Sequence, residues 1–237
     1  MREVKKLQLP LNEEQINWFK DVALDVEQGW DVIIFCHYLT SKSPLKHGGK
    51  QSYVNGAEYI YEIVNNYQGN GNILAFITGH THYDCISLHE CKVPVVCTTC
   101  DHNRSFQYIE NKGETEFSEL LEPRIIRTIT EQAFDIVNYD KKAKLLHFCR
   151  IGSRAMNRTD YFDGNAQVDF RTILLETISV GTTKQLNTIF SGNVTWESTS
   201  DAVLVNNGII SALRTGSAVI NVTNQNREIQ SFFVKII

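Results

Sequence analysis

The stretch Ile73-Leu74-Ala75-Phe76-Ile77-Thr78-Gly79-His80-Thr81-His82 carries a continuous apolar run directly into a glycine and two histidines. An apolar run of this length, rich in Ile and Phe and bounded by turn residues, is typical of a buried strand. Glycine at a strand end permits a sharp turn or a close approach to a ligand. Because His80 and His82 lie two residues apart, both imidazoles can reach one small volume, and imidazole is the commonest metal ligand. The stretch predicts a strand that delivers metal ligands; a surface turn with two histidines is the alternative.

A second apolar run, Val32-Ile33-Ile34-Phe35-Cys36, also ends on a histidine, His37. In open α/β sheets, ligands bind beyond the carboxyl ends of the strands. Two neighbouring core strands that each end on histidine would bring His37, His80 and His82 to one edge of the sheet. One histidine after a strand is more often structural than catalytic, but three at the same edge favour a metal site.

Helices are predicted on both sides of the first strand, over residues 12–28 and 55–67. Asn12 suits the N-cap of the first helix, and Gly29 suits its end. This order of helices and strands predicts an α/β fold, with a sheet covered by helices. Shorter strands are expected further along the chain, at residues 84–89, 93–98, 133–140 and 143–150.

The strand that ends on His37 and the Gly79-His80-Thr81-His82 sequence resemble the calcineurin-like metallophosphoesterase family, and the resemblance covers roughly residues 13–100. The last two sequence blocks of that family are a strand ending in His and a strand ending in Gly-His-x-His. The resemblance implies a partial β-sandwich with flanking helices over residues 1–168, and the hydrolysis of phosphoric esters. It implies two divalent metal ions (Mn, Fe, Zn or Mg) that activate water for attack on phosphorus. It further implies that His37 and His80 ligate one metal and that His82 ligates the other.

The three N-terminal blocks of the family, Asp-x-His, Gly-Asp-x-x-Asp and Gly-Asn-His-Asp/Glu, have no counterpart before His37. They supply the metal-bridging Asp, an Asn ligand and the His that donates to the leaving group, so the catalytic residue stays unknown. Three neutral imidazoles do not balance two divalent cations, and hard cations need oxygen ligands. We therefore expect a truncated domain that is inactive alone, with Met1 an internal or artificial start. A single structural zinc on the three histidines is the alternative.

Two further features near this edge have weaker claims to a site. The polar loop at residues 40–54 leaves the edge and carries His47 and Lys50, which could contact phosphate; a solvated loop is the alternative. Cys97 and Cys100 have CxxC spacing, but a zinc or redox site needs a second pair or a helical context. We expect these cysteines to be structural thiols.

Three arginines lie at or after the strand predicted over residues 143–150, namely Arg150, Arg154 and Arg158. Guanidinium groups at a turn can bind phosphate through paired hydrogen bonds. A structural role for these arginines is the expectation, with phosphate binding as the alternative.

The composition changes after about residue 170, where charged residues thin out and Thr, Ser, Val, Ile and Asn take over. Short strands separated by turn residues every 8–12 positions or so are typical of an all-β sandwich. Trp196 suits a core anchor of such a sandwich, and Asn207-Gly208 suits a tight turn. The expected strands are 173–179, 184–189, 193–198, 202–206, 209–213, 217–224 and 229–236.

Residues 172–237 resemble the bacterial Ig-like group 2 domain. Its marks are a Thr-Trp-x-Ser strand, an Asn-Gly turn and a Gly-small-Ala-x-Ile strand, and Trp196, Gly208 and residues 216–220 match them. The resemblance implies a spacer or binding module of surface, secreted or phage proteins, with a surface or carbohydrate ligand as a possible partner. It favours an extracellular or cell-surface location, although no signal peptide is visible in the chain.

Composition excludes some classes of function. The formal net charge of -4 gives no electrostatic case for nucleic acid. No apolar stretch reaches the roughly 18 residues that a membrane span needs. Two function classes remain: a metal-dependent phosphoric ester hydrolase acting on a phosphorylated small molecule or other phosphoester, and a binding or adhesion protein whose phosphoesterase half is vestigial. The three retained histidines favour the first.

Overall fold

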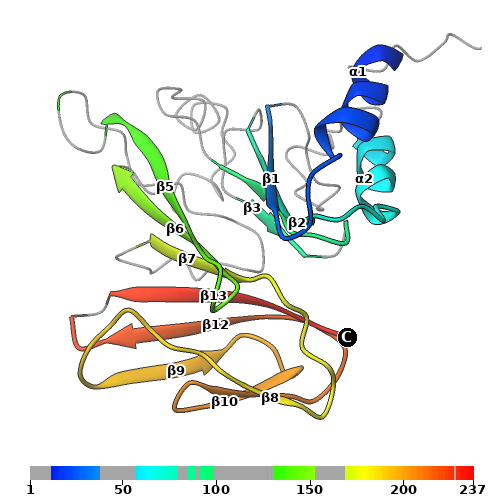
Figure 1. The fold of residues 1–237 in the computed structure, drawn as a ribbon. Coiled ribbons are helices and arrows are strands. Elements are labelled where there is room, and N and C mark those ends of the chain that lie inside the picture. Colours follow the sequence, from blue (N-terminus) through cyan, green and yellow to red (C-terminus); the bar gives the residue numbers. More distant parts are fainter. Residues whose placement is uncertain are drawn as a thin grey trace, which may run out of the picture. The chain divides into compact units, whose positions relative to one another are not determined.

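The computed structural model describes residues 12–37, 57–79, 85–88, 91–98, 127, 131–152, 169–226 and 228–237. Within these residues the protein is mostly β, with three sheets and few helices (Figure 1). The chain divides into two compact units, one drawn from Met1–Thr81 and Ile86–Cys97 and the other from His82–Cys85 and Thr98–Ile237. No helix among the described residues is both long and apolar enough to cross a membrane.

The first unit is built around a parallel sheet. Strand β1 (Asp31–Cys36) pairs in parallel with β2 (Asn72–Thr78), and β2 pairs in parallel with β4 (Val95–Cys97). Beyond β4 lies β3 (Cys85–Ser87). Helix α2 (Ala57–Asn65) joins β1 to β2, because two adjacent parallel strands need a long crossover connection. The two strands predicted from the apolar runs and the helix predicted between them are confirmed.

Helix α1 (Glu13–Trp18) precedes the sheet and begins where predicted. The side chain of Asn12 accepts a hydrogen bond from the backbone N–H of Gln15 at 2.8 Å, and the Gln15 side chain accepts one from Asn12 at 3.0 Å. This reciprocal capping box satisfies two backbone donors of the first turn. The helix continues as the π-helical turn η1 (Phe19–Ala23) and ends there, short of the predicted end at residue 28.

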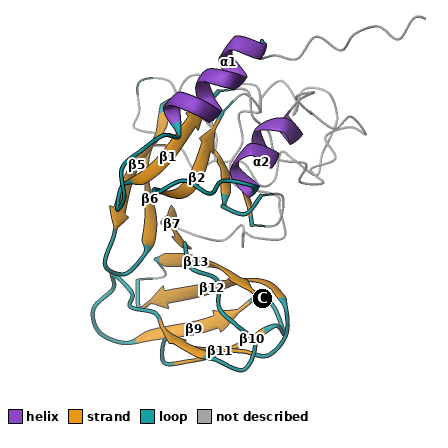
Figure 2. Cartoon of the chain, turned by 45° about the vertical axis from the view of Figure 1, so that its right-hand side comes forward, coloured by secondary structure: helices purple, strands orange, loops and turns teal. Residues whose placement is uncertain are grey.

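Both helical segments pack on the same face of the parallel sheet (Figures 1 and 2). Phe76 of β2 is fully buried there, and the ring of Tyr61 from α2 meets it edge-on with centroids 5.6 Å apart. Phe19 of η1 packs against the same cluster. Just after α2, Tyr67 donates its hydroxyl hydrogen to the carbonyl of Leu24 at 3.0 Å. This tertiary hydrogen bond joins the residue at which the helical segment ends to the segment that follows α2.

The second unit contains a six-stranded mixed sheet and a three-stranded antiparallel sheet. The six-stranded sheet has the order β5-β6-β7-β13-β12-β9, and the three-stranded sheet has the order β10-β11-β8. All pairs in the larger sheet are antiparallel except β7 with β13, which are parallel. The strands are β5 (Ala133–Asp140), β6 (Leu145–Gly152), β7 (Asp169–Leu174), β8 (Thr183–Gln185), β9 (Val194–Ser198), β10 (Val203–Asn206), β11 (Ile209–Ala212), β12 (Gly216–Asn224) and β13 (Ile229–Ile236).

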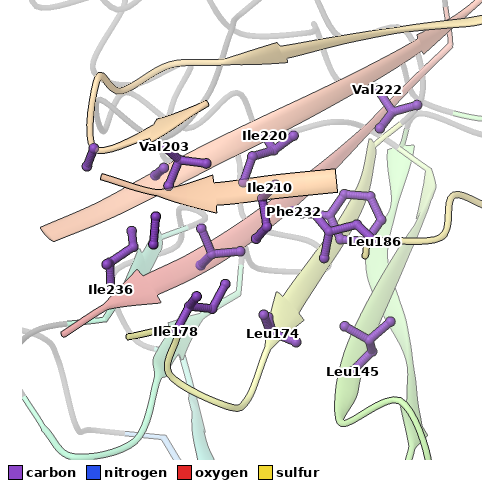
Figure 3. Close-up of a cluster of buried hydrophobic side chains, with 14 residues drawn as sticks. Leu145, Leu174, Ile178, Leu186, Val203, Ile210, Ile220, Val222, Phe232 and Ile236 are labelled. Atoms are coloured by element: carbon purple, nitrogen blue, oxygen red, sulfur yellow. The ribbon is translucent and has the colours of Figure 1, made fainter. Parts of the chain in front are cut away.

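The two sheets of this unit enclose a shared apolar core, to which the β5–β6 hairpin also contributes through Leu145. Ile220 and Phe232 of the larger sheet and Ile210 of the smaller sheet are fully buried in it (Figure 3). The indole ring of Trp196 packs against this cluster, stacked on the Phe232 ring with centroids 6.0 Å apart and an interplanar angle of 24°. The predicted role of Trp196 as a core anchor is therefore confirmed.

The β10–β11 hairpin turns through Asn207 and Gly208, since Asn206 pairs with Ile209 across it. Asn207 has a φ angle of 48° and Gly208 a φ angle of 79°. Two consecutive residues with positive φ are the requirement of a type I′ turn, which Asn-Gly meets at the least steric cost. The turn predicted from this dipeptide is confirmed.

The predicted domain boundary, between residues 168 and 172, falls beside β7. This strand pairs on one side with β6 and on the other with β13. The hairpin β5–β6, which lies before that boundary in the sequence, therefore shares a hydrogen-bonded sheet with the strands that follow it. The division into two domains at this position stays a prediction.

The face of the six-stranded sheet opposite the sandwich core carries a buried ion cluster. Arg150 donates two hydrogen bonds to the carboxylate of Asp135, from Nε to Oδ1 at 3.0 Å and from Nη2 to Oδ2 at 3.1 Å. Arg171 donates from Nη2 to Oδ1 of the same carboxylate, and its guanidinium carbon lies 5.6 Å from the ring centroid of Phe148. The three charged side chains are at most 3% exposed. Arg150 thus has the structural role expected of it.

Candidate metal site at the carboxyl edge of the parallel sheet

The carboxyl ends of β1 and β2 lie side by side. Cys36 pairs with Thr78 at the end of the two strands, and the backbone N–H of Gly79 donates to the carbonyl of His37 at 3.3 Å. His37 is exposed at this edge. Two segments that are 42 residues apart in the sequence are therefore in register at the point where each strand ends.

The imidazole of His37 lies against Gly79. A Cβ atom built at Gly79 would be 3.3 Å from Nδ1 of His37 and 3.7 Å from Cε1. The first distance is shorter than an ordinary van der Waals contact, so the ring uses space that any other residue at position 79 would fill. The chain passes from Gly79 directly into His80. The glycine of the Gly-His-x-His sequence thus has a steric reason to be there.

The neighbouring strand β4 ends at the same edge. Thr78 pairs with Cys97, and the buried hydroxyl of Thr78 donates to the carbonyl of Val96 at 3.3 Å. Thr98 follows β4 and is partly exposed. The described side chains of this edge offer the imidazole of His37, the thiol of Cys36 and the hydroxyls of Thr78 and Thr98, and none of them is a carboxylate.

Most of the predicted site residues lie outside the described residues: His80 and His82, and both phosphate-contact candidates, His47 and Lys50. The same is true of Cys100, Arg154 and Arg158. Of the three predicted metal ligands, the structure places His37. In the ranges that the structure describes, no group of three or more His, Cys, Asp or Glu side chains could hold a metal ion.

The chemistry of the predicted donor set restricts the metal. Three neutral imidazoles suit a borderline-soft ion such as Zn2+. They do not suit Mg2+, which demands oxygen ligands in octahedral geometry. A second divalent ion at the same edge requires a carboxylate to bridge the pair and offset its charge. The donor set therefore fits one metal ion, and fits two only if carboxylates join it.

Sequence reasoning missed two features of the second unit. The first is the cluster of Asp135 with Arg150 and Arg171. Its signal in the sequence is a charged residue, Asp135, on the less exposed face of an alternating strand, between Ala133 and Val137. The second is a pocket beside Trp196. Its residues come from separate segments that the fold brings together, so no local motif marks it.

Comparison with models of protein families, with characterised proteins and with solved structures finds no match to this chain.

Proposed function

We propose that the first unit belongs to a metal-dependent phosphoric ester hydrolase of the calcineurin-like metallophosphoesterase kind, and is its C-terminal part. The observation that supports this most strongly is the contact between His37 and Gly79 at the carboxyl edge of β1 and β2. It brings the histidine after one strand against the glycine that opens the Gly-His-x-His sequence on the next. The same pair of strands and the same two sequence blocks characterise that family.

In this proposal His37 and His80 hold one metal ion and His82 holds the other. When bound, the metals lower the pKa of a water molecule and polarise the phosphoryl oxygens. The imidazoles fix the position of the ions without adding charge, so the carboxylates that offset the ions have to come from residues beyond the described edge. His47 and Lys50 are candidates for contact with the negatively charged phosphate.

For the second unit, we propose an Ig-like sandwich of the bacterial group 2 kind, formed by the strands after residue 172. The stacked pair Trp196 and Phe232 and the type I′ turn at Asn207 and Gly208 support this assignment. They are the core anchor and the tight turn that the sequence pattern of that domain requires.

The first test is metal binding by the 237-residue chain. We expect one Co2+ or Zn2+ ion per chain, followed by the visible absorption of Co2+ and by calorimetry. Without the carboxylates that a pair of ions needs, the three imidazoles are expected to share this single ion, so His37→Ala and His82→Ala should each weaken binding by about 100-fold or more. His147→Gln is the matched control, since His147 bonds to Thr172 in the other unit and should leave the affinity unchanged. Metal affinity that survives His37→Ala would contradict the site.

The variant Gly79→Ala tests the geometry within the same experiment. It keeps all three imidazoles, but its Cβ atom forces the His37 ring away by a few tenths of an ångström. Displacing an oriented ligand in this way should cost about 10-fold in metal affinity. Affinity equal to the parent chain would show that the close packing of His37 on Gly79 has no part in binding.

The second test is hydrolysis. The 237 residues alone should not hydrolyse p-nitrophenyl phosphate or bis-p-nitrophenyl phosphate, because they provide no bridging carboxylate of the family type. A longer form that contains the three N-terminal blocks should do so with Mn2+, and His82→Ala should abolish that activity. Undiminished hydrolysis by the His82→Ala form of the longer protein would refute the role of this histidine.

A binding or adhesion protein with a vestigial phosphoesterase half is the second candidate function. This second candidate is favoured by the pocket beside Trp196 in the second unit, because none of the lining residues belongs to the histidine edge of the parallel sheet. The two candidates are separated by the metal titration: a vestigial edge binds no metal ion, whereas the hydrolase retains its affinity for one.

A further inference from the structure

A pocket of about 610 Å3 opens on the second unit, lined by residues of three separate segments. The first runs from the end of β8 into the following loop, the second leads into β9, and the third is the turn between β10 and β11. The lining residues are Gln185, Leu186, Asn187, Thr188, Gly192, Asn193, Val194, Trp196 and Asn207. A volume of this size is in the range of pockets that hold small-molecule ligands.

One wall of the pocket is an indole ring held in a fixed position. Trp196 stacks on Phe232, which is fully buried in the sandwich core (Figure 3). Gly208 lies against the edge of the same indole, because a Cβ atom built at Gly208 would be only 3.0 Å from Cζ2 of the ring. Trp196 nevertheless remains partly exposed. A ring supported on one face and along one edge is a pre-ordered surface for an apolar ligand face.

Around the indole stand side-chain amides that are not used by the fold. Asn187, Asn193 and Asn207 are exposed, and within the described part of the chain their side chains make no hydrogen bond. The Gln185 amide donates to the carbonyl of Leu186 at 2.8 Å. Each free carboxamide provides two donors and one acceptor, so the three together can bond several hydroxyl groups at once.

The lining contains no charged side chain. A pocket built for a phosphate, a carboxylate or an ammonium group needs an opposite charge or a cluster of backbone N–H groups to offset desolvation. A neutral ligand rich in hydroxyl groups has no such need. The C–H face of a pyranose ring packs on an indole, and its hydroxyl groups both donate and accept, as a carboxamide does.

We propose that this pocket binds a neutral oligosaccharide, with a sugar ring on Trp196 and hydroxyl groups bonded to Asn187, Asn193 and Asn207. The type I′ turn holds Asn207 with a φ angle of 48° and so fixes the backbone from which its amide extends at the pocket. The pocket lies wholly within the second unit, so this assignment is independent of the proposed phosphoesterase site.

The test is calorimetric titration of the full chain with four neutral hexasaccharides: cellohexaose, maltohexaose, laminarihexaose and chitohexaose. At least one should bind with a Kd below about 1 mM. The triple variant Asn187→Ala, Asn193→Ala, Asn207→Gly should weaken that binding by about tenfold or more, because three hydrogen-bonding side chains are lost. Glycine at position 207 removes the amide and keeps the positive φ angle of the turn.

Asn206→Ala is the matched control, because Asn206 is also exposed but is not part of the lining. It should bind the same hexasaccharide with the affinity of the parent chain. Trp196→Phe retains an aromatic core anchor on Phe232 and should weaken binding at least fivefold while the chain stays folded. Absence of binding to all four probes, equal binding by the triple variant, or an equal loss in Asn206→Ala would each overturn the proposal.

Discussion

Asp135→Asn should lower the free energy of unfolding by about 3–5 kcal/mol, because it leaves two buried guanidinium groups without their carboxylate. Asn has almost the volume of Asp, so the variant changes the charge and leaves the packing in place. Arg150 loses a bidentate partner and Arg171 loses the same carboxylate. The measurement is urea unfolding followed by circular dichroism at neutral pH, with the free energies obtained by linear extrapolation.

The chain offers a matched control for this variant in the surface pair Arg214 and Asp201. Their side chains are 61% and 79% exposed, whereas Arg150 and Asp135 are 1% and 3% exposed. Asp201→Asn should therefore cost less than about 1 kcal/mol. Replacing these three side chains together by apolar residues, as in Asp135→Leu with Arg150→Met and Arg171→Met, should recover part of the lost stability. Equal costs for Asp135→Asn and Asp201→Asn would show that the buried cluster is not a major source of stability.

The same cluster should make the protein sensitive to acid. Burial acts to raise the pKa of Asp135, but the charges of Arg171 and Arg150 outweigh burial and hold the pKa below the ordinary value of 3.8. An aspartate with a lowered pKa in the folded protein contributes stability in full above 3.8 and loses it as the pH falls through the folded pKa. The stability difference between the parent chain and Asp135→Asn should therefore shrink as the pH is taken below 3.8. A difference that does not depend on pH would contradict this origin.

Gly208→Ala should destabilise the second unit by about 3 kcal/mol, through backbone strain and overpacking together. Its φ angle of 79° is unfavourable for any residue with a Cβ atom. The new Cβ would also lie 2.8 Å from the carbonyl oxygen of Leu186, which is backbone and cannot rotate away. The backbone of Leu186 is also hydrogen-bonded to the turn, because its N–H donates to the Gly208 carbonyl at 2.8 Å.

Gly181→Ala separates the two causes. Gly181 has a similar φ angle of 83°, but no atom lies within 4 Å of a Cβ built there. Gly181→Ala should therefore lower the free energy of unfolding by the backbone strain alone, about 1 kcal/mol. Urea unfolding of both variants gives the steric part as the difference between them. If Gly208→Ala and Gly181→Ala lower the free energy of unfolding by the same amount, the packing of Gly208 on Leu186 and Trp196 contributes nothing to stability.

Much of the fold could be predicted from the sequence, because its signals are local. The strand predicted over residues 133–140 has the same bounds in β5, since every second residue is inward and the turn after Asp140 is polar. The Asn207-Gly208 dipeptide predicts its turn because few other residues tolerate two positive φ angles in succession. The end of the first helix was not predicted in this way: the sequence offers Gly29 as the stop, whereas the helical turns end at Ala23, and the next residue, Leu24, bonds to the hydroxyl of Tyr67, 43 residues away.

The candidate metal site was predictable only in part, because its geometry depends on contacts between residues that are far apart in the sequence. A strand that ends on His37 and a second that ends on Gly79 can be recognised separately, and parallel pairing brings them together. The steric fit of the His37 ring on Gly79 depends on the exact register, which the apolar pattern does not specify. The pocket beside Trp196 has no sequence signature, because its three segments meet only after the two sheets of the second unit have packed.

Strand β7 has a consequence for how this chain can be cut. Because β7 pairs with both β6 and β13, a single ladder of backbone hydrogen bonds runs from the β5–β6 hairpin to the C-terminal strand. A protein ended before Asp169 would keep the hairpin and leave the outer side of β6 as an open edge, which invites pairing with other chains. The composition thus changes near residue 170, but the hydrogen-bonded sheet continues across that position. Proteolytic or engineered separation there would tend to yield an aggregating fragment instead of two independent domains.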